Sequence, residues 1–332
     1  MKDWHKLKPE MFEKQPYYRP GCDTYVTLHS NKENALNARK LALCLILALC
    51  PLNAWAETAV PAQADWVAAR QSVTTADGLT LTYVEAGNPD GPPLLLLHGY
   101  TDNSRSWSLL APLLADRRLI MVDLRGHGGS AAPACCYGPD SLAHDVDSFI
   151  QAIDLPRADV MGHSLGSIAA MSLAAWYPER VNHLVLVSTA LSMPAAPTEW
   201  LWANVPGLPD TIDPQSQFML DWYWNPNPVS ADFIDRERAE SAATPRQTWM
   251  GVLRGLSAMD LTKVAPMVQA PTLILWGDQD GFFDATSQEA VKAAFPKAGY
   301  EAFPGFGHNM FWEVPDQVAA KVAAFLDVST AE

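Results

Sequence analysis

Positive charge is scarce in this sequence. Its 332 residues include 23 lysines and arginines against 37 aspartates and glutamates, which gives a net charge of −14. Residues 1–56 contain 8 of the basic and 5 of the acidic residues, so the remainder has 15 basic and 32 acidic residues and a net charge of −17. Nucleic acids are bound by clusters of basic side chains. Since the sequence has no such cluster, we expect no nucleic-acid partner.

Cysteines are also few. Three of the five lie within residues 1–56, and the other two, Cys135 and Cys136, are adjacent. An adjacent pair cannot connect distant segments, which excludes a disulfide framework. A disulfide between these neighbours is an alternative in an oxidising compartment, but such a bond is strained, so we expect two free thiols.

Patterns for metals and phosphates are missing as well. No group of His, Cys, Asp and Glu has the spacing of metal ligands. The glycine-rich run at 123–130 has neither the G-x-G-x-x-G pattern nor a Lys-Ser/Thr ending, so we expect a structural turn there. We therefore expect no metal and no cofactor.

An apolar run at 41–52 is too short to span a bilayer, which needs about 20 residues. Arg39 and Lys40 precede it, and a small-x-small pattern at 54–56 follows. These three parts are typical of a secretory signal. We predict an N-terminal extension plus signal at 1–56, cleavage after Ala56, a periplasmic or secreted protein and no stable membrane anchor.

From residue 71 onward, short apolar runs alternate with segments of helical periodicity. The expected strands are 71–75, 79–86, 94–97, 119–122, 159–161, 184–187, 272–276 and 300–303. The expected helices are 107–115, 142–153, 165–177, 287–295 and 315–326. This alternation predicts an α/β fold with a mostly parallel sheet and helices on both faces.

Residues 190–266 interrupt the alternation, because they contain no strong strand pattern. This stretch holds five tryptophans, and prolines punctuate its first half. We predict a helical cap at 190–266, inserted into a core formed by 57–189 and 267–332. The aromatic side chains can form the small core of the cap, contact a ligand, or do both.

The pentapeptide at 162–166, Gly-His-Ser-Leu-Gly, lies between an expected strand and an expected helix. In that context the G-x-S-x-G pattern predicts a sharp turn that exposes the serine. Glycines on both sides leave room for the turn. Ser164 is therefore the predicted nucleophile.

A serine hydroxyl needs a general base to become a nucleophile. His308 lies in a glycine-rich loop after the last expected strand and follows the serine and an acid in chain order. Asp280 is the preferred acid, because Asp278 leaves the strand at once and is expected to shape the turn. Asp284 is a weaker third candidate. Asp280 would hold the histidine in the correct tautomer.

Acyl transfer also needs donors for the oxyanion that develops. We predict the backbone N–H groups of Tyr100 and Leu165, with His98 bracing the loop after the strand 94–97. Such a donor contributes roughly 10²–10³-fold to the rate.

In their order and spacing, these motifs resemble the α/β-hydrolase superfamily, in its esterase- and lipase-like branch with a cap, from about residue 74 to 325. The matching motifs are His98-Gly99, Asp123-x-Arg125-Gly126-x-Gly128-x-Ser130, Gly162-x-Ser164-x-Gly166, Gly277-x-x-Asp280 and Gly307-His308. The resemblance implies an eight-stranded sheet and the triad Ser164, Asp280 and His308. Related haloalkane dehalogenases and epoxide hydrolases have aspartate in place of the serine in this turn, so Ser164 argues against both.

The expected reaction is cleavage of a small-molecule carboxylic ester through an acyl-serine. The same triad serves C–C bond, lactone and amide hydrolysis, and a ligand receptor of this fold without turnover is a further alternative. The cap aromatics suggest an apolar substrate group under Trp222 and Trp224, with Phe306 as a third expected pocket residue.

Overall fold

A sheet of eight strands forms the scaffold of the protein. The computed structural model describes residues 59–328, and the predicted extension and signal at 1–56 lie outside them. The strands are β1 (Gln71–Thr74), β2 (Thr80–Gly87), β3 (Pro93–Leu97), β4 (Arg118–Asp123), β5 (Ala158–His163), β6 (Val181–Val187), β7 (Thr272–Gly277) and β8 (Gly299–Phe303). Their order is β1-β2-β4-β3-β5-β6-β7-β8. Only the pairings of β2 are antiparallel, so the prediction of a mostly parallel sheet is confirmed.

Burial explains why the central strands read as continuous apolar runs. Every residue of β5 and β7 is buried, and four of the five residues of β3 are buried. A strand covered on both faces has no solvent side, so it shows no alternation of apolar and polar residues.

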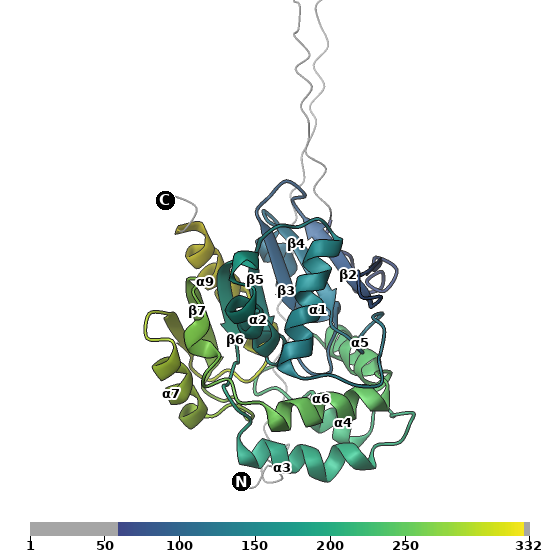
Figure 1. Ribbon diagram of the computed structural model, residues 1–332. Helices are drawn as coiled ribbons and strands as arrows, with labels where there is room; N and C mark the ends of the chain where they lie inside the picture. Colours follow the sequence, from purple (N-terminus) through teal and green to yellow (C-terminus); the bar gives the residue numbers. More distant parts are fainter. Residues whose placement is uncertain (1–58, 329–332) are drawn as a thin grey trace, which may run out of the picture. The chain divides into compact units, whose positions relative to one another are not determined.

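Helices cover both faces of this sheet. Those outside the predicted cap are α1 (Pro139–Ala152), α2 (Leu165–Trp176), α7 (Ala285–Ala294), α8 (Met310–Glu313) and α9 (Pro315–Val328). Figure 1 shows α1 and α2 side by side on one face and α9 on the opposite face. The arrangement confirms the expected α/β class.

The helix expected at 107–115 does not form. Two short 3₁₀ turns, η2 (Ser104–Trp107) and η3 (Ala111–Leu114), take its place. Pro112 lies in the second turn. Proline has no N–H and clashes with the carbonyl four residues earlier, so a continuous α-helix cannot run through this position.

Four helices occupy the stretch predicted as a cap: α3 (Ala195–Asn204), α4 (Gln217–Trp222), α5 (Ala231–Ala242) and α6 (Arg246–Ala258). They lie between β6 and β7 in the sequence and gather at one end of the sheet (Figure 1). Residues 190–266 are called the cap below.

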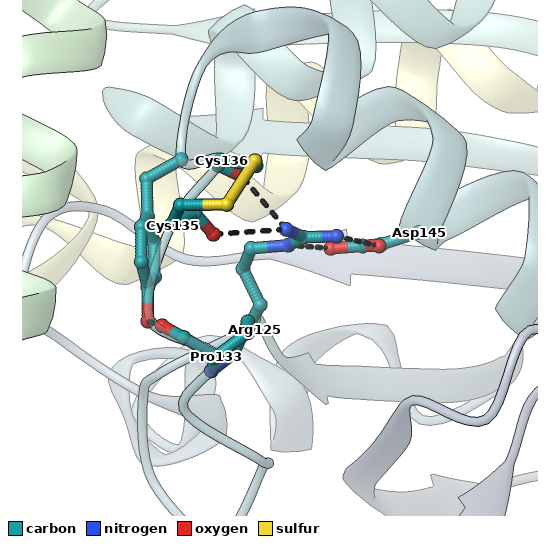
Figure 2. Close-up of a disulfide and its surroundings, with 6 residues drawn as sticks. Arg125, Pro133, Cys135, Cys136 and Asp145 are labelled. Atoms are coloured by element: carbon teal, nitrogen blue, oxygen red, sulfur yellow. Dashed lines mark hydrogen bonds and ion pairs between the residues drawn. A yellow bond between two sulfur atoms is a disulfide. The ribbon is translucent and has the colours of Figure 1, made fainter.

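The expectation of two free thiols is wrong, because Cys135 and Cys136 form a disulfide. Cys136 has a left-handed φ of 73°. Figure 2 shows the guanidinium of Arg125 between this loop and Asp145 of α1. Arg125 Nη1 donates to the Cys136 carbonyl at 2.7 Å, and the Asp145 carboxylate accepts from Nε and Nη2.

Candidate active site

A sharp turn between β5 and α2 carries the predicted nucleophile. Ser164 has φ 50° and ψ −116°, a conformation that a residue with a side chain rarely adopts. Its N–H donates to the Val187 carbonyl at 3.0 Å, which ties the turn to β6. A Cβ atom at Gly162 would lie 2.2 Å from the Gly166 carbonyl oxygen, and one at Gly166 would lie 2.0 Å from that of Leu97. Both glycines are therefore needed for the turn.

The structure brings His308 and Asp280 together, as predicted. Both loops follow neighbouring strands, β8 and β7, and His308 Nδ1 lies 2.9 Å from each carboxylate oxygen of Asp280. The Asp280 Oδ1 also accepts from the N–H groups of Phe282 at 2.8 Å and Phe283 at 3.0 Å. An imidazole whose Nδ1 donates to a carboxylate has its lone pair on Nε2. That nitrogen is then available as a base.

The His308 loop is also tied to the turn that carries Ser164. The His308 carbonyl accepts from Ser188 Oγ at 2.7 Å and lies 3.1 Å from Nε2 of His163. The His163 and His308 rings lie 4.9 Å apart. Burial, followed by the charge of His308, lowers the pKa of His163 well below its usual value, so His163 is neutral and serves as a donor.

The Ser164 hydroxyl has no hydrogen-bond partner within residues 59–328. The structure thus pairs two of the three predicted catalytic residues, and His163, the residue before Ser164, contacts one of them.

The two predicted oxyanion donors lie at the starts of the segments after β3 and β5. Leu165 is the first residue of α2, and the first N–H groups of a helix have no acceptor within it. Among the described residues, neither the Leu165 nor the Tyr100 N–H has a hydrogen-bond partner. His98 braces the Tyr100 loop as expected, since its Nε2 accepts from the Leu124 N–H at 2.9 Å. Burial, followed by the charge of His127, lowers the pKa of His98 to about 3, which keeps this ring neutral.

Comparison with known proteins assigns the fold family. Residues 92–315 match the family model described as alpha/beta hydrolase fold. The chain belongs to this family.

Individual relatives carry names of different activities, with hydrolases among them. The chain is 29% identical to Lipase 3 of Moraxella sp. (strain TA144), over 77% of its own length and 84% of that protein's. It is also 29% identical to 2-(acetamidomethylene)succinate hydrolase of Mesorhizobium japonicum, over 75% and 92% of the two lengths. A solved structure of a hydrolase from Pseudomonas aeruginosa PA01 is similar with a TM-score of 0.70 and 28% identity, covering 77% of this chain and 98% of that one.

Among the predicted pocket residues of this hydrolase, Trp222 lies near the candidate triad. Its ring is 5.5 Å from Phe282, whose ring is 5.0 Å from His308. It also lies 5.5 Å from the ring of Tyr100. Trp222 therefore belongs to an aromatic group that connects the cap to the histidine loop.

The other two predicted pocket residues lie differently. Trp224 is 47% exposed, so about half of its side chain faces solvent. Phe306 is half-buried and contacts Phe303 of β8, and its carbonyl accepts from the Gln279 N–H at 2.9 Å. Both positions stay predictions as pocket residues.

The remaining acid candidates have structural roles. Asp278 Oδ1 accepts from the Gly305 N–H at 2.7 Å, as expected of a turn-shaping residue. Asp284 caps α7 by accepting from the Ser287 N–H. The run at 123–130 is a turn around buried Asp123, whose carboxylate accepts from the N–H groups of Ser104 and Gly129 and from Thr82.

A buried acidic pair, formed by one residue of the loop after β3 and one residue of the cap, was not predicted. Asp102 lies in the same loop as Tyr100, and its Oδ1 accepts from Tyr223 Oη at 2.9 Å. Burial raises the pKa of Asp102 to about 6. Glu237 of α5 is fully buried, neither of its carboxylate oxygens has a hydrogen-bond partner among the described residues, and burial followed by the charge of Asp102 raises its pKa well above the usual value. No sequence pattern signals such a pair, because its members are far apart in the chain.

The residues that the structure describes include neither a candidate metal site nor a candidate membrane-spanning helix. Within 59–328, no group of three or more His, Cys, Asp or Glu side chains is placed to hold a metal ion. In the same range, no helix is both long and apolar enough for a membrane span.

Proposed function

We propose that this hydrolase cleaves carboxylic esters of small molecules through an acyl intermediate on Ser164. One observation carries the proposal: His308 Nδ1 is hydrogen-bonded to both oxygens of Asp280, while its carbonyl is held by His163, the residue before Ser164. This geometry supports an imidazole that is fixed in one tautomer beside a serine on a sharp turn.

In the proposed reaction, His308 Nε2 takes the proton of Ser164 Oγ as the oxygen attacks the ester carbonyl. The imidazolium that forms is stabilised by the Asp280 carboxylate, which keeps its charge. His308 then gives the proton to the departing alkoxide, and the acyl group remains on Ser164. A water molecule, activated by the same nitrogen, hydrolyses the acyl-serine and restores the free enzyme.

The N–H groups of Tyr100 and Leu165 are proposed to bind the oxyanion of each tetrahedral intermediate. Their unpartnered state among the described residues supports this role, because a donor aimed at a developing charge needs no reorganisation during the reaction.

Two relatives and one aromatic group of this chain bear on the substrate class. The relative named as a lipase supports ester cleavage. The relative named 2-(acetamidomethylene)succinate hydrolase supports the alternative of cleavage at an acetamido compound with the same residues. The aromatic group around Trp222 and Phe282 supports an apolar substrate portion beside His308.

A panel of p-nitrophenyl esters, lactones and amides tests the proposal on the purified chain. We expect Ser164→Ala to lower kcat for the best ester by roughly 10⁴-fold or more. Ser172→Ala is the matched control, since Ser172 is a buried serine further along α2 whose Oγ has no partner among the described residues. Ester hydrolysis that survives Ser164→Ala would refute the proposed nucleophile.

We also propose that the protein acts outside the cytoplasm. The signal pattern at 1–56 supports export, and the Cys135–Cys136 disulfide fits an oxidising compartment. Sequencing the N-terminus of the protein recovered from a periplasmic or culture fraction should give Glu57 first. An N-terminus within residues 1–30 on the functional protein would contradict export by this signal.

A further inference from the structure

Three consecutive residues of the loop after β3 are each hydrogen-bonded to a different part of the cap. Tyr100 Oη donates to the carbonyl of Trp249 in α6, and Thr101 Oγ1 is bonded to Ser241 Oγ of α5. Asp102 Oδ1 accepts from Tyr223 Oη, directly after α4, at 2.9 Å. We call this set of bonds the three-point contact.

All three loop residues of the three-point contact are shielded from water. Tyr100 is 7%, Thr101 0% and Asp102 4% exposed. Burial raises the pKa of Tyr223 well above its usual value, so its hydroxyl keeps its proton and donates to Asp102. Buried hydrogen bonds of this kind fix geometry, since breaking one leaves a desolvated polar group without a partner.

Besides the three-point contact, two arginines outside the cap are paired with a glutamate of α5. Arg105 of η2 donates from Nε to Glu240 of α5 at 2.8 Å, and Arg70 donates to the same carboxylate at 2.8 Å. The Tyr100 ring also meets the rings of Trp222 at 5.5 Å and Trp249 at 5.3 Å, both edge to face. The loop is thus attached to the cap by hydrogen bonds, an ion pair and aromatic packing.

The backbone of the same loop includes the N–H of Tyr100. A displacement of about 1 Å at a reacting group can lower a rate by roughly 10²-fold. We propose that the cap positions the Tyr100 N–H through the three-point contact, so that the side chains of Tyr100, Thr101 and Asp102 are positioning residues for acyl transfer. This inference rests on the proposed function.

The test removes single hydroxyl groups from the cap side. Tyr223→Phe and Ser241→Ala each delete one bond of the three-point contact and leave the loop sequence intact. We expect kcat to fall roughly 10-fold in each variant and about 100-fold in the double variant, a part of what complete loss of a donor costs. KM should stay within about threefold, because the lost interaction acts in the transition state.

Matched controls remove the same groups elsewhere. Tyr300→Phe deletes a hydroxyl of β8 that contacts Gln288, and Ser257→Ala deletes one of α6 that bonds the Leu253 carbonyl. Both controls should keep kcat within about twofold.

A second readout separates positioning from general damage. A trifluoromethyl ketone adds to the serine and places a tetrahedral oxyanion in the hole, so its affinity follows transition-state binding. Its Ki should rise in each variant by the factor by which kcat/KM falls. Near-ultraviolet circular dichroism verifies folding, and the single variants decide the matter if the double variant does not fold.

Three outcomes would overturn the inference: kcat of the folded double variant within about twofold of the parent, a rise in KM alone, or a fall in kcat without a change in the ketone Ki. Failure of the proposed function is distinguished by Ser164→Ala. If that variant is inactive while the double variant is fully active, only the positioning role is wrong. If Ser164→Ala stays active, the proposed function itself is wrong.

Discussion

The two N–H groups proposed to bind the oxyanion are held by different parts of the molecule. Leu165 follows a turn that is fixed by the core alone, through the Val187 carbonyl and the close approach of Gly166 to Leu97. Tyr100 lies in a loop whose side chains bond to the cap. The position of the Leu165 N–H is therefore set by core residues, and we infer that the position of the Tyr100 N–H depends on the packing of the cap.

The two sides also differ in how many hydrogen-bond donors surround their buried carboxyl groups. On the core side, Asp280 accepts from two backbone N–H groups and from His308, so its charge is well compensated. On the cap side and among the described residues, Asp102 has a single hydroxyl donor and Glu237 of α5 has no partner. On the cap side, where donors are few, burial raises the pKa of Asp102 to about 6 and that of Glu237 well above its usual value.

The largest expected effect lies on the core side. Asp280→Asn should lower kcat by about 10⁴-fold, because an amide cannot hold the imidazole in the tautomer that leaves Nε2 free. Asp278→Asn is the control, since its side-chain oxygen can still accept from the Gly305 N–H. Steady-state kinetics on the best ester measures both, and a greater loss at Asp278 than at Asp280 would move the acid role to Asp278.

A smaller effect is expected from crowding the turn of the core. Gly166→Ala would place a Cβ atom 2.0 Å from the Leu97 carbonyl oxygen, so β3 and α2 must separate. We expect a loss of roughly 2–4 kcal/mol in the free energy of unfolding, measured by urea denaturation. Gly207→Ala in the cap meets nothing within 4 Å and should be nearly neutral. Equal effects at the two glycines would show that the turn is not tightly packed.

The smallest expected effect concerns the acid under the cap and depends on pH. The folded protein holds the Asp102 proton up to about pH 6, while the unfolded chain releases it near 3.8. Folding therefore binds a proton between these values, and the contribution of this carboxyl to stability falls as pH rises from 4 to 7. The amide of Asp102→Asn does not titrate. Relative to that of the parent, the free energy of unfolding of this variant should therefore rise by on the order of 2 kcal/mol between pH 4 and pH 7.

Urea denaturation at pH 4 and pH 7 measures this change, with Asp116→Asn at an exposed position as the control. A difference between parent and Asp102→Asn that stays constant over this range would contradict a raised pKa at Asp102.

Sequence patterns predicted those parts of the fold and the candidate site that depend on neighbouring residues. All eight strands form close to their predicted positions, and the buried parallel strands left the clearest signal because they are continuous apolar runs. The turn at Ser164 and the pairing of Asp280 with His308 followed from strand ends that meet at one edge of the sheet. The helix at 107–115 was predicted wrongly, because the prediction followed the apolar periodicity and did not account for Pro112.

What the sequence did not reveal depends on contacts between distant residues. The bonds of the three-point contact join residues that are 149, 140 and 121 positions apart. The packing of cap helices on the loop determines these pairs, and no local pattern encodes it. The same holds for Glu237, since an isolated glutamate in a helix is typical of a solvent-facing position. The Cys135–Cys136 bond was not predicted either, because the spacing of two cysteines does not indicate the backbone conformation between them.

Covalent labelling with a fluorophosphonate tests the proposed role of Ser164 most directly. The reagent reacts with a serine only where a neighbouring base activates it. Mass spectrometry of the labelled chain should find one adduct, on the peptide that contains Ser164, with a matching loss of ester hydrolysis. Labelling should be abolished by Ser164→Ala and strongly slowed by His308→Ala. An adduct on another residue, or full hydrolysis by a chain labelled at Ser164, would contradict the proposed mechanism.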